Sequence, residues 1–290
     1  MTVQTHPQTT RDLRLAARQG LLPARGSGWL AGFNNMLGKE LGEWFGTRRW
    51  LAHLLAWLVL ITGSVAGVAA MLTAPALLQP ELAASAAPAA VYPPLLQAFF
   101  QISMMVTAVG AATSAQGVLI GERQLGTAAW ILSKPASRSA FVLAKLAAYA
   151  TALLALAVVL PSVAGYGAIW MLAERAPNLV GIVAGVGVWG LHLLFYLALT
   201  LMLGTLLASR GPVLGIGLGF LFAGIFLPSI FPIGMVIFPW SLPGLSMMLA
   251  LGADAAGAIS TTAIIPLLAT IMWTVLFIVV ALWRFERQEF

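Results

Sequence analysis

The sequence predicts an all-α membrane protein with six transmembrane helices, both termini in the cytoplasm, and an amphipathic interfacial helix before the first span. Three observations lead to this prediction. Hydrophobic residues make up 60% of the 290-residue chain and charged residues only 8%, long charge-free runs recur, and basic residues cluster in alternate segments. A soluble domain carries about 25% charged residues. The composition therefore excludes a soluble enzyme, a nucleic-acid-binding module and a disordered chain.

Six charge-free runs follow Arg49, and each exceeds the roughly 20 apolar residues that a membrane-spanning helix needs. They occupy 50–80, 82–121, 146–173, 176–209, 211–253 and 255–283. Within these runs, and allowing for errors of several residues at each boundary, we place the spans near 50–72, 95–120, 140–163, 179–207, 213–232 and 263–283.

The run 211–253 is long enough to hold two spans, which would give seven in all. Four prolines interrupt it: Pro228, Pro232, Pro239 and Pro243. Since proline lacks an N–H and clashes with the preceding helical turn, we expect one span that breaks near Pro228, followed by short re-entrant or interfacial pieces. A seventh span would also place Arg284 and Arg287 outside.

Basic residues set the orientation, because Lys and Arg are retained on the cytoplasmic side. With the N-terminus inside, Lys145 lies just within the third span and only Arg175 lies outside. The other 13 of the 15 Lys and Arg residues fall in cytoplasmic segments: Arg11, Arg14, Arg18, Arg25, Lys39, Arg48, Arg49, Arg123, Lys134, Arg138, Arg210, Arg284 and Arg287.

The polar residues 1–28 predict a flexible cytoplasmic tail with one short helix near Thr10–Gln19. Residues 29–46 differ, because apolar side chains recur there at steps of three and four and predict an amphipathic helix. Directly before a span, such a helix should lie in the headgroup plane. Its apolar face is Leu30, Phe33, Leu37, Leu41 and Trp44, and its polar face is Asn35, Lys39, Glu40 and Glu43.

Two glycine patterns occur in the spans. The run Gly185–Gly190 matches the dinucleotide-binding pattern G-x-G-x-x-G, but that fingerprint needs a preceding strand and an acidic residue about 20 positions later. No carboxylate occurs between Arg175 and Asp254, so the match carries no cofactor. Small residues four apart let helix backbones approach closely in lipid, and they predict helix packing at Gly181, Gly185, Gly215 and Gly219.

The chain has few residues that could form a catalytic or metal-binding site. It contains no cysteine, no phosphate loop and only three histidines, too scattered for a metal site. Ion-coupled transporters usually carry an acidic residue in the middle of the membrane, and these spans have none. His192 could contact a substrate, although a hydrogen bond to a neighbouring helix is the simpler role. The residues thus predict no catalytic site and no cofactor in this chain.

The segment 121–138 between the second and third spans is the most informative. We expect a short helix that starts at Gly126 or Thr127, shows Ala128, Ile131 and Leu132 on one face, and stops at Pro135. A short helix with charged flanks is suited to docking into a groove on another protein. The alternative is a basic loop anchored to lipid headgroups.

The residues of this segment resemble the signature of ABC-2 type transporter permeases. The similar pattern is Glu122-Arg123-x-x-Gly126-Thr127, then Leu132-Ser133-x-Pro135-x-Ser137-Arg138, then Phe141 and Lys145. Upstream, Gly38-Lys39-Glu40-Leu41-x-Glu43-Trp44 with Arg48-Arg49-Trp50 is similar to the entry helix of that family. The likeness covers 29–290 in layout, and its specific letters lie in 38–50 and 122–145.

The resemblance implies a dimer of permease chains, here a homodimer, on two copies of a separate ATP-binding subunit that holds ATP and Mg. The coupling helix would lie within 122–138, flanked by a docking helix with Lys39, Glu40 and Glu43. The implied ATPase-coupling residues are Glu122, Arg123, Gly126, Thr127, Leu132, Lys134, Pro135 and Arg138.

We therefore expect a permease subunit of an ATP-driven exporter in a prokaryotic inner or plasma membrane. Since the spans offer few charges, its cargo should be hydrophobic or amphipathic. Two alternatives stay open: an ABC-2-like membrane subunit for periplasmic metallo-enzyme maturation or signalling, and an ATPase-independent transporter or scaffold.

Overall fold

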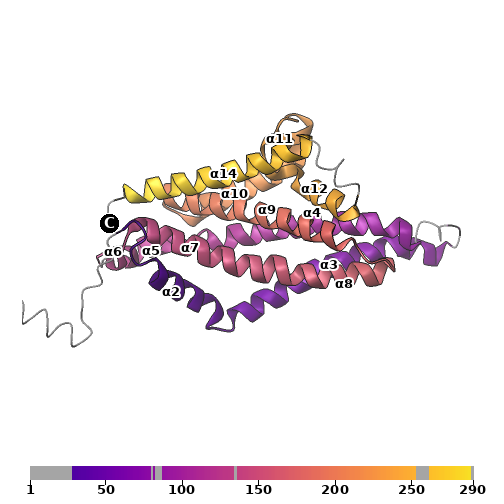
Figure 1. Cartoon of the computed structure of the whole chain (residues 1–290), viewed down its shortest axis with the longest axis horizontal. Coiled ribbons are helices and arrows are strands. Elements are labelled where there is room, and N and C mark those ends of the chain that lie inside the picture. The colour runs from indigo at the N-terminus through magenta and orange to yellow at the C-terminus, as the bar shows by residue number, and fades with distance from the viewer. Residues whose placement is uncertain (1–27, 80, 82–86, 134–135, 253–260, 289–290) are drawn as a thin grey trace, which may run out of the picture.

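The structure, a computed structural model, describes residues 28–79, 81, 87–133, 136–252 and 261–288. Every regular element in those ranges is helical, as the sequence predicts (Figure 1). The predicted tail helix near Thr10–Gln19 lies outside the described residues. The α-helices are α2 (Phe33–Phe45), α3 (Arg49–Leu78), α4 (Pro88–Ala115), α5 (Val118–Gln124), α6 (Thr127–Leu132), α7 (Arg138–Leu153), α8 (Leu160–Ala173), α9 (Leu179–Leu206), α10 (Arg210–Phe226), α11 (Gly234–Ile237), α12 (Leu242–Leu251) and α14 (Thr261–Glu286).

Six helical stretches of the described chain are long and apolar enough to cross a membrane, which gives the protein the character of a multi-pass membrane protein. Their number agrees with the prediction, but several are longer than expected. The second and third were placed at 95–120 and 140–163, whereas the helices extend over Pro88–Gln124 and Arg138–Ala173. The six stretches are Arg49–Leu77, Pro88–Gln124, Arg138–Ala173, Leu179–Leu206, Arg210–Ser229 and Ala263–Glu286.

The third stretch continues past Pro161 by means of a π-helical segment. Proline inside a helix leaves a carbonyl unpaired and clashes with the preceding turn. The segment Leu154–Val159 has π-helical hydrogen bonding, and Pro161 follows it in the first turn of α8. Such π-bulges insert an extra residue per turn. They account for the continuation of this helix beyond residue 163.

Helices α9 and α4 form the centre of the bundle, and α3, α10 and α14 surround them. In the most apolar window of α9, 67% of the residues are buried, against 11% in α14. The indole of Trp189 on α9 donates to the hydroxyl of Thr107 on α4 at 2.9 Å, and its ring meets Phe99 edge-on. The central pair is thus held by both packing and a buried hydrogen bond.

The chain after α10 is broken, as the prolines predict. Helix α10 ends at Phe226, and a 3-10 turn Leu227–Ser229, the short helix α11 and a second 3-10 turn Pro239–Ser241 follow before α12. Helix α12 then packs closely on α9: a Cβ at Gly181 would lie 2.1 Å from the carbonyl oxygen of Leu249. This region is therefore a compact, broken cap and does not form a seventh straight span.

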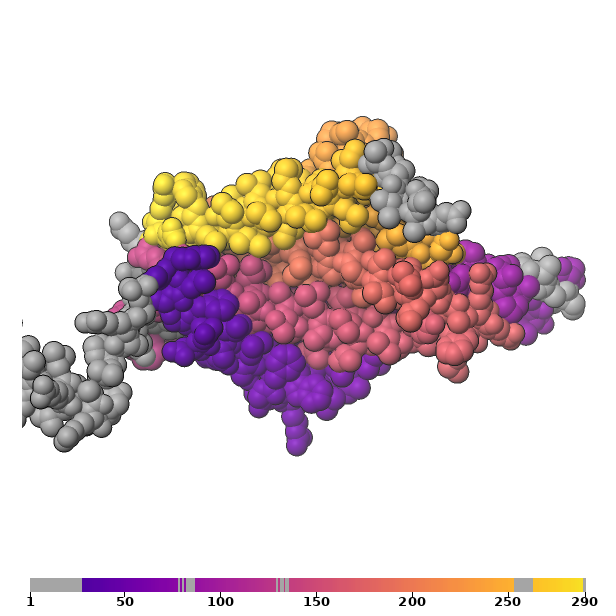
Figure 2. Space-filling model, viewed as in Figure 1, coloured from indigo at the N-terminus to yellow at the C-terminus, as the bar shows by residue number. Residues whose placement is uncertain are grey.

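Helices α2 and α3 meet at an angle whose corner lies at the edge of the bundle (Figure 1). Figure 2 shows them along one side of the molecule, with α14 on the opposite side. The helix predicted at 29–46 is α2, Phe33–Phe45, but its faces differ from the prediction. Glu40 was expected on the polar outer face, and it is buried together with Trp44. The reason is a buried partner for its carboxylate, described next.

Candidate functional site

Helices α5 and α6 lie together at one end of the bundle, called here the α5–α6 end (Figure 1). Gly126 joins them with a φ of +68°, in the left-handed region that only glycine adopts without a steric cost. Its N–H donates to the carbonyl oxygen of Arg123 at 3.2 Å. Helix α6 then begins at Thr127, which confirms the predicted start of a short helix in this segment.

Lys145 is the centre of an ionic cluster that joins three parts of the chain at this end. Its ammonium lies 2.7 Å from a carboxylate oxygen of Glu40 on α2 and 2.9 Å from one of Glu122 on α5. The Lys145 and Glu40 side chains are only 4% and 7% exposed. The second oxygen of Glu122 accepts a hydrogen bond from the Thr127 hydroxyl. The cluster therefore fixes α2, α5, α6 and α7 relative to one another.

Lys39 forms the outer part of the same cluster. Its ammonium lies 3.4 to 3.7 Å from the carboxylates of Glu43, Glu40 and Glu122, and half of its side chain is exposed. Partial burial acts to lower the pKa of Lys39, but the nearby carboxylates of Glu40, Glu122 and Glu43 outweigh it and raise that pKa above its usual value. Lys39 is therefore a permanent cation at neutral pH.

Two arginines hold the ends of transmembrane helices. Arg123 donates to the carbonyl oxygen of Leu207 at 2.7 Å and also to that of Gly204, at the end of α9. Arg138 donates to the carbonyl oxygens of Glu286 and Gln288, both at 2.6 Å, at the end of α14. The last carbonyls of a helix lack intrahelical partners and carry partial negative charge. Both guanidinium groups therefore act as C-terminal caps supplied by other helices.

The tip of this end also carries exposed apolar side chains. Leu125 is 79% exposed and Trp130 is 64% exposed. They line, together with Lys39, Glu122 and Lys145, a groove of about 490 Å³ between α2 and the α5–α6 turn. Of the expected apolar face, Ala128 is fully buried against the bundle, and the side chains of Ile131 and Leu132 lie outside the described residues.

The predicted coupling residues divide into three groups. Glu122, Arg123, Gly126, Thr127 and Arg138 lie at this end with the contacts described above. The flanking residues Lys39, Glu40 and Glu43 come from α2 to the same place. Lys134 and Pro135 lie outside the described residues, and so does the side chain of Leu132.

Sequence reasoning missed the role of Lys145 and the exposure of Leu125. Lys145 was placed just inside the third span, with no partner assigned. The usable signal was its position in an apolar run, because a buried ammonium requires an anionic partner. Glu122 was already recognised. It lies 23 residues from Lys145, a separation that spans the end of α5, the whole of α6 and the start of α7.

The glycines predicted for helix packing behave differently in the two helices. A Cβ at Gly185 would come within 2.9 Å of the Ser246 carbonyl oxygen, so α9 and α12 do approach at Gly181 and Gly185. A Cβ at Gly215 or Gly219 would meet nothing within 4 Å in the described chain. No neighbouring helix of the described chain packs on those two positions, so helix packing there stays a prediction. In α10, Gly217 is buried instead.

His192 is buried in α9, and its ring lies 4.9 Å from that of Tyr196. It lines a small cavity of about 70 Å³ with Met104 and Trp240. Within the described residues its Nδ1 atom has no hydrogen-bond partner. The interhelical hydrogen bond favoured from the sequence is thus missing at this nitrogen.

A family model described as a protein of unknown function (DUF2705) matches residues 85–290. The match includes Glu122, Lys145 and the two capping arginines, and it leaves out α2 and α3. A comparison with curated proteins finds no match.

Proposed function

We propose, for a chain that belongs to the DUF2705 family of proteins of unknown function, that it is the permease subunit of an ATP-driven exporter of the ABC-2 type. A separate subunit would bind Mg and hydrolyse ATP. The chain would form a homodimer on two copies of that subunit. Its cargo would be hydrophobic or amphipathic, since the membrane-spanning helices offer few charged groups.

The observation that supports this proposal is the construction of the α5–α6 end. An apolar tip with Leu125 and Trp130 exposed is attached to the bundle through the Glu122–Lys145–Glu40 cluster. Arg123 and Arg138 connect the same end to α9 and α14. A partner that binds the tip could therefore displace transmembrane helices directly, because the tip is connected to them through these contacts.

The proposal assigns a side of the membrane to each element. Both termini and the α5–α6 end would face the cytoplasm, and α2 would lie along the inner surface of a prokaryotic inner or plasma membrane. The broken cap with α11 and α12 would close the outer end of the pathway. This orientation follows the bias of Lys and Arg along the chain.

Cysteine labelling tests the orientation, because the chain contains no cysteine of its own. We expect R175C to react with a membrane-impermeant maleimide in intact cells. L125C, at the tip, should react only after the membrane is permeabilised. Labelling of L125C from outside would overturn the proposed orientation, and with it the docking to a cytoplasmic ATPase.

Site-specific crosslinking tests the docking. A photo-reactive residue at Leu125 in the full chain should capture a protein that binds and hydrolyses ATP. The matched control is the same residue at Met71, which is 77% exposed on α3. When the L125S variant is purified, less ATPase activity should copurify with it than with the wild-type chain. Its insertion into the membrane should be unchanged. The proposal is wrong if no nucleotide-binding protein is captured at Leu125, or if Met71 captures it equally.

A further inference from the structure

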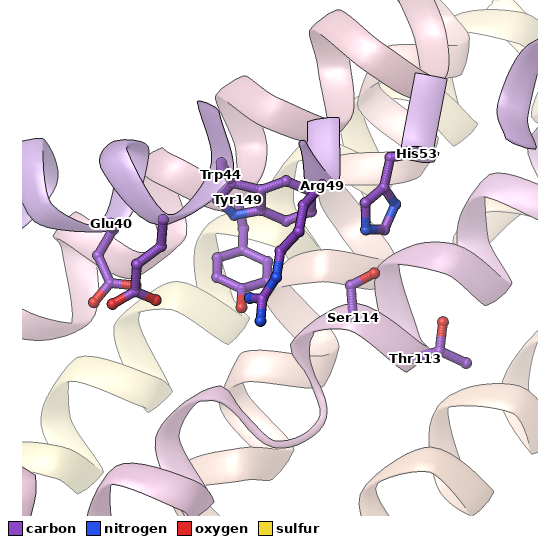
Figure 3. Close-up of a pocket in the computed structure, with 8 residues that line it drawn as sticks. Glu40, Trp44, Arg49, His53, Thr113, Ser114 and Tyr149 are labelled. Atoms are coloured by element: carbon purple, nitrogen blue, oxygen red, sulfur yellow. The ribbon is translucent and has the colours of Figure 1, made fainter. Parts of the chain in front are cut away.

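A second cavity, of about 280 Å³, lies in the angle between α2 and α3 and is closed by α4 and α7 (Figure 3). Its size is just below the range for drug-sized ligand sites, about 300–1,000 Å³, which suits a small polar group. Its lining is unusually polar for a chain with so few charged residues. The lining residues are Glu40, Glu43, Trp44, Arg49, His53, Thr113, Ser114 and Tyr149.

The lengths of the helices indicate where the cavity lies relative to the bilayer. The stretch Pro88–Gln124 has 37 residues and Arg138–Ala173 has 36, or about 55 Å each at 1.5 Å per residue. The hydrocarbon core of a bilayer is about 30 Å thick, so both stretches extend beyond it. The first stretch begins only at Arg49, and α3 packs on α8 and the π-helical segment. We therefore place the boundary between hydrocarbon and headgroups at the α5–α6 end near the level of Arg49.

Opposite charges occupy different parts of this cavity. In Figure 3 the Glu40 carboxylate lies on one side of Tyr149, and Ser114 and Thr113 lie on the other, with the Arg49 guanidinium beside the Tyr149 hydroxyl. Among the described residues no carboxylate lies within ion-pairing distance of Arg49, in contrast to the lysines of the adjacent cluster. The cavity thus offers a cation and hydroxyl groups at one part, and carboxylates at another.

We propose that this cavity binds the phosphoethanolamine headgroup of a membrane phospholipid. The phosphate would accept hydrogen bonds from Arg49, Ser114 and Tyr149, because a guanidinium matches phosphate geometry. The primary ammonium would donate to Glu43, whose side chain is 56% exposed and has only Lys39 nearby, at 3.4 Å. This inference rests on the membrane-spanning helices and the cavity, and it does not depend on the proposed ATPase partner.

The aromatic residues favour a primary ammonium over choline. A quaternary ammonium has no N–H donor and is recognised by open aromatic faces. Trp44 is only 8% exposed, because the rings of His53 and Tyr149 lie 5.1 and 5.2 Å from it. The Trp44 ring is therefore not open to a ligand. The adjacent cluster has three carboxylates for the two ammonium groups of Lys39 and Lys145, so one negative charge remains, and Glu43 is its most exposed carboxylate at 56%.

The outer surface of α3 continues this site toward the hydrocarbon. Leu51, Leu55 and Val59 are 41%, 53% and 69% exposed, and their spacing of four residues places them on one face of the helix. The acyl chains of a lipid whose headgroup enters the cavity would lie along this strip. A lipid thus fits both the cavity and its surroundings, whereas soluble phosphoethanolamine would use the cavity alone.

Native mass spectrometry of the full chain in detergent tests the proposal with defined lipids. The protein is offered equal amounts of phosphatidylethanolamine, phosphatidylglycerol and phosphatidylcholine of identical acyl chains. We expect preferential retention of one phosphatidylethanolamine. R49Q should weaken that retention about tenfold, as loss of a hydrogen bond between charged groups implies. R48Q is the matched control. It removes the same charge one residue away, and Arg48 does not line the cavity.

Two further arms identify the groups that are recognised. E43Q should reduce retention of phosphatidylethanolamine more than that of phosphatidylglycerol, because only the first has an ammonium. Soluble phosphoethanolamine at equal concentration should not displace the lipid. The proposal is overturned if the three lipids bind equally, if R49Q and R48Q have equal effects, or if the soluble compound displaces the lipid. R49Q must elute as a single species of wild-type size, and S114A provides a milder variant if it does not.

Discussion

Removing the ammonium of Lys145 tests whether the ionic cluster holds the α5–α6 end together. The perturbation is K145M, which keeps the length and most of the apolar volume of the side chain. It leaves Glu40 buried without its partner at 2.7 Å, and Glu122 without its partner at 2.9 Å. Only Lys39 remains nearby, at 3.7 Å from each carboxylate.

The size of the effect follows from burial. Breaking a buried ion pair by removing one partner costs about 3–5 kcal/mol, since the other charge stays desolvated. Glu40 is 7% exposed and Glu122 is 15% exposed, so Glu40 should contribute most of this cost. We therefore expect K145M to lower the free energy of unfolding by about 3 kcal/mol or more. The exposed control K39M should cost less than about 1 kcal/mol.

Equilibrium unfolding in micelles measures these differences, and a second variant separates charge from packing. Glu40→Gln in the K145M background removes the more buried of the two stranded charges, so the double variant should be more stable than K145M by at least about 1 kcal/mol. If the double variant is no more stable than K145M, the loss comes from packing and the electrostatic reasoning fails. If K39M costs as much as K145M, burial does not control the effect.

Three further substitutions probe separate features. G181A should destabilise the protein by about 1–3 kcal/mol through overpacking, because its Cβ would lie 2.1 Å from the Leu249 carbonyl oxygen. The control G215A, where a Cβ meets open space, should be neutral or slightly stabilising in thermal unfolding. T107V should cost about 1–3 kcal/mol, since the buried Trp189 N–H loses its acceptor, whereas T113V at an exposed hydroxyl should not change the unfolding midpoint. G126A should cost about 1–2 kcal/mol, because alanine at a φ of +68° is strained, and it should speed amide hydrogen exchange in α5 and α6. Unchanged exchange would contradict the expected strain in the variant's turn.

The membrane-spanning helices were predictable because their signal is compositional. Every charge-free run of the sequence overlaps one of the long apolar helices of the described chain. The lengths were less predictable, since prolines that would end a helix in water occur inside these helices. Pro75, Pro93 and Pro94 lie within α3 and α4, and Pro161 follows a π-helical segment. Neighbouring helices and local changes in hydrogen bonding re-satisfy the freed backbone groups.

The cluster at the α5–α6 end could be predicted only in part. Its acidic residues stand out because charges are rare in this chain, and Gly126 marks a turn. The pairing of its acidic and basic side chains depends on how α2 packs on α7, and the helical period of the sequence does not determine that packing. Glu40 shares the predicted polar face with Lys39 and Glu43, yet it turns inward to Lys145. A buried cation 105 residues away overrides the amphipathic pattern.

A few polar contacts fix particular helix ends relative to one another in this mostly apolar bundle. Van der Waals packing joins helices in lipid but gives little direction, because lipid tails are as apolar as leucine. Directional contacts fix helix ends instead, and several of them converge at the α5–α6 end. Arg123 holds the end of α9, Arg138 holds the end of α14, and Lys145 holds α2. A displacement of this end would therefore act on three helices together. The broken cap after α10 is joined to α9 both by close packing at Gly181 and Gly185 and by a hydrogen bond from the Ser246 hydroxyl to the Gly185 carbonyl oxygen at 3.1 Å.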